Sequence, residues 1–515
     1  MATLLSRVLG MIRDIATASL FGVSAGGLLD AFVVALRIPD LFRRLFGEGT
    51  LAASYVPVLA RALEQDREQA RGILSGCWRY VVIASLSLVV VGEGLCGVAW
   101  WLTPRDTPLL GLMMLLLPYV FFICLTAQLA ATLQVLDRFA IPALVPTIFN
   151  VCWLLGLVCA AYATPSDWLR VHLLAGSIVV AGLIQLALQW WALARLDFLP
   201  TLRAASDSLP EVAQIATSLA PAVLGLAVTQ LNTFVDSILA WALSAPAPEV
   251  VRSNFAFPLS PGAAAVTYYG ERIYMFPLGF LGIAMAIAVF PQLSRTAARG
   301  ERQAVGRELS QALRLILWLA LPASVGLVLL AHPLLQLMLQ RGAFTAEDTA
   351  RTARAVQGYA AGIWAFCALP LVIRGFYALG NVRSPARQAL PALVVNVVLS
   401  LLLVWPWQEA GLAWGTSLTA IIQLGLLALT FSWYESHLLW RPLLTSLLRT
   451  ILLCGLMGFV GLGLLQLAGP RPIIRLLLPL FGCGGVYLAA SWSIGCPELR
   501  QLVEAIHQRS RPSCG

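Results

Sequence analysis

Apolar residues form long blocks along almost the entire chain, and short polar or Pro/Gly-rich breaks separate the blocks. A helix needs about 20 apolar residues to cross a bilayer, and each block is close to or above that length. Cutting the chain at the breaks therefore predicts fourteen membrane-spanning helices. They lie near 3–22, 28–60, 73–101, 108–135, 142–163, 171–194, 212–242, 263–293, 310–331, 350–379, 389–406, 410–434, 443–468 and 474–494.

The composition agrees with this pattern. The chain has 515 residues, of which 59% are hydrophobic and 11% are charged, whereas about 25% are charged in an average soluble protein. The mean hydropathy is +0.83. So much apolar surface cannot be buried in one soluble core. We therefore predict an all-α polytopic membrane protein with about fourteen transmembrane helices.

The distribution of arginine predicts the orientation. If the N-terminus is cytoplasmic, arginines in the cytoplasmic loops and tail outnumber those on the other side two to one. Cytoplasmic loops carry such an excess of basic residues in membrane proteins, so both termini are expected in the cytoplasm. The net charge of +9 is explained in this way, and no nucleic acid is expected as a partner.

An internal repeat indicates two related bundles. The stretch VPVLARALEQDREQA at 56–70 aligns without gaps on FPQLSRTAARGERQA at 290–304, an offset of 234 residues. Repeats in the same orientation are typical of transporters with a site between two bundles; chance matching of short apolar sequences is the alternative. The predicted domains are an N-terminal bundle (1–209), a C-terminal bundle (210–442), a C-terminal helix pair (443–496) and a cytoplasmic tail (497–515).

Charged side chains are concentrated in three predicted spans, where each is costly to bury in lipid. They are Arg7, Arg13 and Asp14 in 3–22; Asp30, Arg37, Arg43, Arg44 and Glu48 in 28–60; and Glu271 and Arg272 in 263–293. The six arginines outnumber the four acids in this set. A guanidinium is suited to phosphate oxygens, so the excess predicts a cleft that binds an anionic substrate. A salt-bridge network that only joins helices is the alternative.

The second half of the chain offers fewer such charges. Asp236 lies one helical turn after Asn232, and with Asn381 or Asn396 it would supply hard oxygen ligands for a monovalent cation such as sodium. An ordinary polar contact between helices is the alternative interpretation. The ten cysteines show no CxxC spacing, and the four histidines have no partner at metal-ligand spacing, so no zinc site is expected.

Four stretches carry a resemblance to a known family. SRVLGMIRD (6–14), DAFVVALRIPDLFRRLFGEG (30–49), YVPVLA (55–60) and GERIYMFPLGFLGIAMAIAVFPQLS (270–294) resemble the MurJ (MviN) lipid II flippases, within the multidrug/oligosaccharidyl-lipid/polysaccharide exporter superfamily. The similarity runs in order over essentially the full chain. Two departures are a start only five residues before Ser6 and a long, proline-rich connection at 243–262.

The resemblance implies a multi-pass protein of the bacterial inner membrane that moves lipid II, the undecaprenyl-diphosphate-linked peptidoglycan precursor, to the periplasmic leaflet. Membrane lipids and the cell-wall synthesis machinery are the other implied partners. Family arginines that grip the diphosphate correspond to Arg13, Arg43 and Arg272, and functionally sensitive family positions correspond to Arg7, Asp14, Asp30 and Glu48. Asp236 corresponds to the acidic ligand of a sodium site, and 443–494 corresponds to a groove for the lipid tail.

Other functions fit the residues less well. A flippase for another polyprenyl-diphosphate-linked glycan, of the O-antigen or capsule type, would need the same arginines. A drug exporter of the superfamily would need acidic and aromatic residues in its cavity, so the arginine excess argues against it. A membrane enzyme acting on polyprenyl phosphates would need clustered aspartates for magnesium, and no DDxxD-like cluster occurs.

Overall fold

The computed structural model describes residues 2–23, 27–47, 50–103, 108–201, 209–245, 256–435 and 438–510. Regular structure in these ranges is helical, apart from one isolated bridge between Ser244 and Leu259. Eleven helices or helix runs are long and apolar enough to cross a membrane. The three other predicted spans, 3–22, 28–60 and 212–242, also form helices. The all-α polytopic class is confirmed, and fourteen spans are consistent with these helices.

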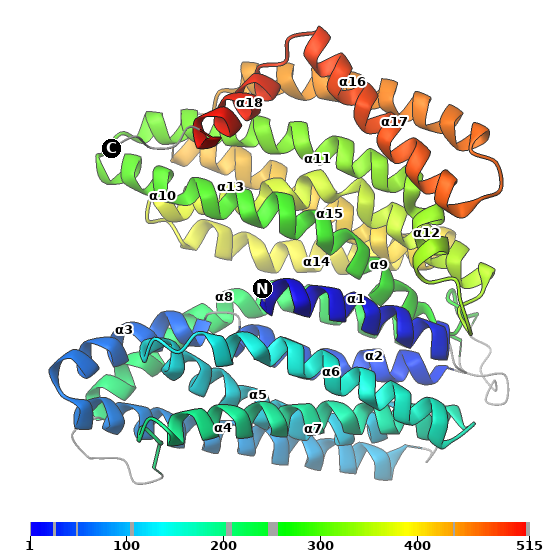
Figure 1. Ribbon diagram of the computed structural model, residues 1–515. Helices are drawn as coiled ribbons and strands as arrows, with labels where there is room; N and C mark the ends of the chain where they lie inside the picture. The colour runs from blue at the N-terminus through cyan, green and yellow to red at the C-terminus, as the bar shows by residue number, and fades with distance from the viewer. Residues whose placement is uncertain are drawn as a thin grey trace. The chain divides into compact units, whose positions relative to one another are not determined.

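The first of two compact units comprises Met1–Ala265 and Arg341–Phe344. Within it α5 is central and packs on α2, α3, α4 and α7, while α1 packs on α6 (Figure 1). Its helices are α1 (Ala2–Phe21), α2 (Leu28–Phe42), α3 (Thr50–Gln65), α4 (Arg67–Leu102), α5 (Pro108–Val135), α6 (Ala140–Ala163), α7 (Asp167–Ala194) and α8 (Leu209–Ala242), with a π-helix, η2 (Arg43–Gly47), between α2 and α3.

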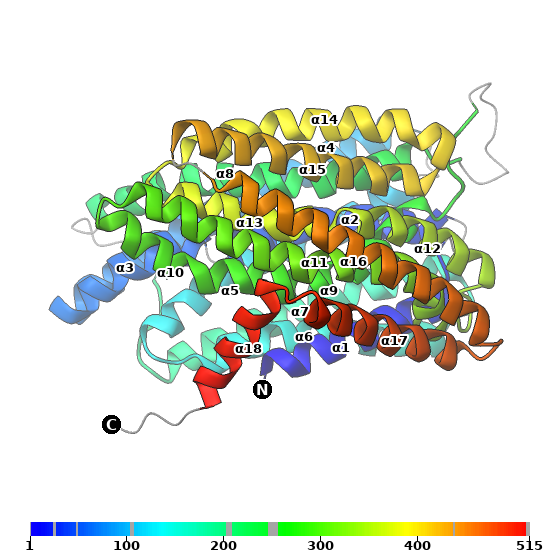
Figure 2. The same ribbon diagram turned by 90° about the horizontal axis from the view of Figure 1, so that it is seen from above.

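The second unit comprises Val266–Gln340 and Thr345–Gly515. Here α11 packs on α12, α13, α16 and α17, and Figure 2 shows the C-terminal pair α16 and α17 side by side. Its elements are α9 (Ala263–Pro277), whose first turn belongs to the first unit, η5 (Leu278–Ile283), α10 (Ala284–Ala298), α11 (Arg302–Met338), α12 (Ala346–Ala361), α13 (Ile363–Ala378), α14 (Arg383–Trp407), α15 (Glu409–Tyr434), α16 (Trp440–Leu467), α17 (Pro472–Ser493) and α18 (Pro497–Ser510).

The sequence repeat has a structural counterpart. When α2, η2 and α3 are shifted by the repeat offset of 234 residues, their bounds fall within about two residues of those of α9, η5 and α10. Both copies are interrupted by a π-helix, a rare element that commonly marks functional sites. The sequence places the bend of span 28–60 at Pro39, but Pro39 lies inside α2 and the π-helix begins four residues later. Two unrelated helices would not be expected to share this interruption.

The compact units divide the chain later than the repeat does. The repeat places the boundary after residue 209, whereas the first unit continues to Ala265, because α8 packs on α2, α3 and α4. In the connection 243–262 the two ends pair, with Ala245 N donating to Leu259 O at 2.9 Å and Leu259 N to Leu243 O at 3.2 Å. Residues 246–255 of this connection lie outside the described residues.

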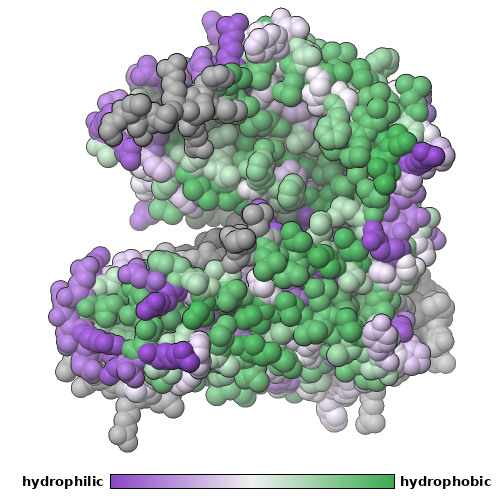
Figure 3. Space-filling model, in the orientation of Figure 1, coloured by the Kyte–Doolittle hydropathy of each residue, from purple (hydrophilic) through white to green (hydrophobic). Residues whose placement is uncertain are grey.

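The surface of each unit fits a lipid environment. On the face shown in Figure 3, hydrophobic residues cover the middle of the helices and hydrophilic residues gather toward helix ends. In the C-terminal pair the exposed side chains include Leu452, Phe459, Phe481 and Trp492, each more than 70% exposed. Such apolar exposure is unfavourable in water but expected for helices in a bilayer. The lipid-tail groove beside this pair stays a prediction.

Candidate functional site

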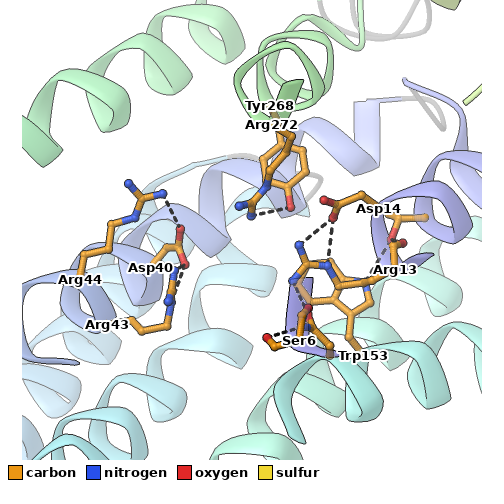
Figure 4. Close-up of polar contacts among 11 residues, drawn as sticks. Ser6, Arg13, Asp14, Asp40, Arg43, Arg44, Trp153, Tyr268 and Arg272 are labelled. Carbon is orange, nitrogen blue, oxygen red and sulfur yellow. Dashed lines mark hydrogen bonds and ion pairs between the residues drawn. The ribbon is translucent and has the colours of Figure 1, made fainter. Parts of the chain in front are cut away.

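Arg13 is buried on α1 and held from three sides. Its Nε and Nη2 donate to Asp14 Oδ1 at 3.0 and 2.7 Å, and its Nη1 donates to Asn150 Oδ1 on α6 at 3.0 Å (Figure 4). The guanidinium also lies 4.6 Å from the ring centroid of Trp153. A buried guanidinium needs such partners. Asn150 in turn donates to Ser6 O at 2.9 Å. Its side-chain amide therefore joins α6 to α1 through two residues, Ser6 and Arg13.

Asp40 is a member of the charged set that the sequence interpretation missed. Its carboxylate lies 3.0 Å from Nη2 of Arg43 and 3.6 Å from Nη2 of Arg44, and Figure 4 shows it between the two arginines. The count of four acids against six arginines was therefore wrong, because Asp40 is a fifth acid. Its spacing of three and four residues from the arginines is the signal that would have found it.

Two arginines of α2 and η2 face α8 within the first unit. Arg37 Nε donates to Ser237 Oγ at 2.9 Å, and Arg44 Nη1 donates to Gln230 Oε1 at 3.1 Å. The two arginines, Asp40 and Gln230 line a cavity of about 10 Å³, which is about the size of one water molecule. A spacing of seven residues, close to two helical turns, places Arg37 and Arg44 on nearly one line along a helix, which agrees with their shared neighbour α8.

Asp30 has a structural role that the sequence did not reveal. Its Oδ2 accepts from Gly262 N at 2.6 Å, and its Oδ1 accepts from Ala265 N at 2.9 Å. These amides belong to the start of α9, where backbone N–H groups lack partners within the helix. The carboxylate of α2 therefore caps a helix that begins more than 200 residues later. Gly262 permits the close approach, since its φ is +95° and an added Cβ would lie 2.9 Å from Val23.

The remaining predicted ligands are placed as follows. Arg272, on α9 in the second unit, donates from Nη2 to Tyr268 Oη at 3.1 Å, and its guanidinium lies 4.9 Å from the centre of that ring. Glu271 beside it is buried. Arg7 is exposed on α1. Glu48 lies outside the described residues. The predicted convergence of Arg13 and Arg43 with Arg272 stays a prediction.

The predicted cation ligands are only partly suited to that role. Asp236 is buried on α8, and the buried Oδ1 of Asn232 has no hydrogen-bond partner in the described part of the chain. These are two hard oxygen donors one turn apart. Asn381 is already used, because its Oδ1 accepts from Ser384 N at 3.0 Å and its amide donates to Glu435. Among the described residues no three His, Cys, Asp or Glu side chains cluster around a metal position.

The arrangement of the first unit is suited to partner exchange. Asp14 and Asp40 occupy some of the donors of Arg13, Arg43 and Arg44, so the guanidinium groups are oriented without a ligand. A diphosphate offers more acceptor oxygens and more negative charge than one carboxylate. It can therefore replace a carboxylate at the guanidinium fork without leaving the arginine unpaired. The arrangement is therefore suited to reversible anion binding.

Comparison with known sequences identifies similar proteins. The sequence model of the family described as "Lipid II flippase MurJ" matches residues 17–478, a range that begins after Arg13 and Asp14. A "Probable lipid II flippase MurJ" of Vibrio cholerae serotype O1 is 31% identical over 441 residues, covering 82% of this chain and 80% of the relative. A "Lipid II flippase MurJ" of Burkholderia cenocepacia is 28% identical over 442 residues, covering 83% and 81%.

Solved structures share the fold. One described as "Lipid II flippase MurJ, inward closed conformation" has a TM-score of 0.76 at 22% identity and covers 98% of both chains. An inward-facing multidrug resistance MATE family transporter of the MOP superfamily has a TM-score of 0.62 at 12% identity, covering 83% of this chain and 94% of that one. The helical architecture is therefore that of known membrane transporters.

Proposed function

The chain belongs to the lipid II flippase MurJ family, and from this premise we propose that it carries lipid II from the cytoplasmic to the periplasmic leaflet of the bacterial inner membrane. It is a multi-pass transporter and not an enzyme. The observation that carries the proposal is the set of oriented guanidinium groups of Arg13, Arg43 and Arg44, each beside a carboxylate that a diphosphate can replace. We propose that Arg272 also contributes to diphosphate binding.

Alternating access explains how such a site serves a flippase. The substrate enters from one leaflet as Asp14 and Asp40 give up their arginine partners, and it leaves when the carboxylates take them back. Neither state contains an unpaired guanidinium in a bilayer, which would be costly. The carboxylates therefore lower the free-energy difference between the loaded and the empty carrier. We propose that both termini face the cytoplasm throughout this cycle.

A monovalent cation is part of the proposal. Asp236 and Asn232 offer two oxygen donors of the hard type that sodium binds. The neighbouring Ser237 accepts a hydrogen bond from Arg37, and this positive charge opposes a cation nearby. We propose that the cation binds beside Asp236 and that its binding depends on the contacts of Arg37, which would couple cation binding to the charged cluster of α2.

Depletion of the protein tests the proposed function. In cells that depend on this chain, loss of the protein should leave lipid II in the cytoplasmic leaflet, measured with a membrane-impermeant reagent that modifies the glycan from the periplasm. Accumulation of an O-antigen or capsule precursor with normal lipid II export would instead favour the alternative flippase. The arginines cannot distinguish lipid II from an O-antigen or capsule precursor, because all of these carry a polyprenyl diphosphate.

A further inference from the structure

A second polar cavity lies wholly within the second unit, and none of the charged residues considered above lines it. It has a volume of about 410 Å³ and lies between α12 and the turn that joins α14 to α15. This volume is within the range of small-ligand sites, about 300–1,000 Å³. Its walls include three indoles, one guanidinium and two amides, from Trp405, Trp407, Trp414, Arg354, Gln357 and Gln408.

The cavity carries a net positive charge. No acidic residue lines it, and the guanidinium of Arg354 makes no hydrogen bond or ion pair within the described part of the chain. Glu409, which follows the cavity residue Gln408 in the sequence, is already paired, because Arg351 Nε donates to Glu409 Oε1 at 3.1 Å. The local charge of Arg354 is thus available to an anion, and its planar fork suits phosphate oxygens.

The turn that shapes the cavity is strained. Gln408 has φ +52° and ψ −133°. Residues other than glycine rarely adopt this backbone conformation, which costs about 1–3 kcal/mol. The turn is also closely packed, since a Cβ added at Gly411 would lie 2.1 Å from Leu403 O. Such strain is found more often at binding sites than elsewhere. Here it presents Trp407, the last residue of α14, and Gln408, the residue between α14 and α15, to one space.

The position suggests the kind of ligand. The cavity lies at the ends of two apolar spans, where tryptophan rings are typical of the boundary between headgroups and acyl chains. Trp405 and Trp407 are about half exposed, so they reach the surrounding lipid as well as the cavity. A ligand here meets indole faces on its apolar side and Arg354 with the glutamine amides on its polar side.

We propose that this cavity binds the phosphate of a membrane-lipid headgroup, with Arg354 as the anion ligand and the three indoles as walls. Two sources share this chemistry: an anionic glycerophospholipid and a polyprenyl phosphate. A neutral sugar would be bound by the indoles and amides but would leave Arg354 without an anion, so the charge favours phosphate. In the proposed orientation the site lies on the periplasmic side.

Native mass spectrometry of the full chain in detergent tests the proposal. The probes are phosphatidylglycerol, a polyprenyl monophosphate and a diacylglycerol without phosphate. We expect Arg354→Gln to weaken binding of a phosphate lipid about tenfold or more, since it keeps the size and an amide but removes the charge. Arg354→Lys should weaken this binding less than Arg354→Gln does, because lysine keeps the positive charge. Arg471→Gln is the matched control, because Arg471 is exposed and lies outside the cavity.

The outcomes are distinct. A selective loss with Arg354→Gln supports the site, and the phosphate lipid that binds more tightly identifies the source. Equal binding by the wild type and Arg354→Gln, an equal loss with Arg471→Gln, or diacylglycerol binding as tight as that of the phosphate lipids would overturn it. Because the experiment measures binding and not lipid II transport, its failure would leave the proposed function unaffected.

Discussion

Asp40 accepts a hydrogen bond from Nε of Arg43 at 3.0 Å, and the same carboxylate pairs with Arg44. If a diphosphate must displace this carboxylate, Asp40→Asn should tighten lipid II binding by up to about fivefold, since a partly exposed ion pair is worth up to about 1 kcal/mol. Binding to purified protein measures the effect. Asp66→Asn is the control, because Asp66 caps α4 and asparagine caps equally well. Weaker binding by Asp40→Asn would contradict the exchange.

Asp30 should stabilise the protein without touching the substrate. Asp30→Ala removes both acceptors for the start of α9, and loss of such a cap costs roughly 0.5–2 kcal/mol. Thermal unfolding in detergent should therefore occur at lower temperature, while lipid II affinity is retained. Glu64→Ala, on the exposed surface of α3, serves as control. Unchanged stability with lost lipid II binding would show instead that Asp30 is a ligand.

The proposed cation site predicts stabilisation by sodium. At a sodium concentration ten times the Kd, binding to the native state alone adds about 1.4 kcal/mol to the free energy of unfolding. Wild-type protein should unfold at higher temperature in sodium chloride than in choline chloride, and Asp236→Asn should abolish the difference. Asp167→Asn, in a partly exposed ion pair with Arg170, should retain the difference. A sodium effect that survives Asp236→Asn would rule out this site.

The parallel repeat predicts which positions share a membrane face. Gln65 and Gln303 are both exposed, near the junctions that follow α3 and α10. Single cysteines at these positions, in a background without the native cysteines, should react with an impermeant reagent from the cytoplasmic side only. Among the described native cysteines Cys159 alone is exposed, so their removal removes little reactivity. Labelling of the two positions from opposite sides would refute the parallel arrangement.

The helices were predictable from the sequence because bilayer thickness sets their length. All fourteen predicted stretches coincide with helices or helix runs. Pro39 predicts an interruption of span 28–60, but Pro39 lies inside α2 and the change to a π-helix comes only at Arg43–Gly47. The repeat predicted two related bundles, but it did not by itself predict the π-helix that interrupts each copy.

The site was predictable only where partners are close in sequence. Asp14 follows Arg13 directly, and Asp40 precedes Arg43 by three residues, so the sequence spacing indicates which acid pairs with which arginine. The pairing of Asp40 was nevertheless overlooked. Asn150 lies 137 residues from Arg13, and the amides capped by Asp30 lie more than 230 residues away. A single sequence contains no spacing signal for such contacts, because they arise from packing of helices that are distant along the chain.

The arginines provide the most direct test of lipid II transport by this chain. In a strain depleted of its own flippase, the fraction of lipid II reached by an impermeant periplasmic reagent should fall to the depleted level with Arg13→Ala, Arg43→Ala or Arg272→Ala. Lysine at one or more of these positions should restore it partly, since it keeps the charge but loses the fork. Arg471→Ala should behave as wild type. Normal lipid II exposure with Arg272→Ala at normal protein levels would contradict the proposed diphosphate site.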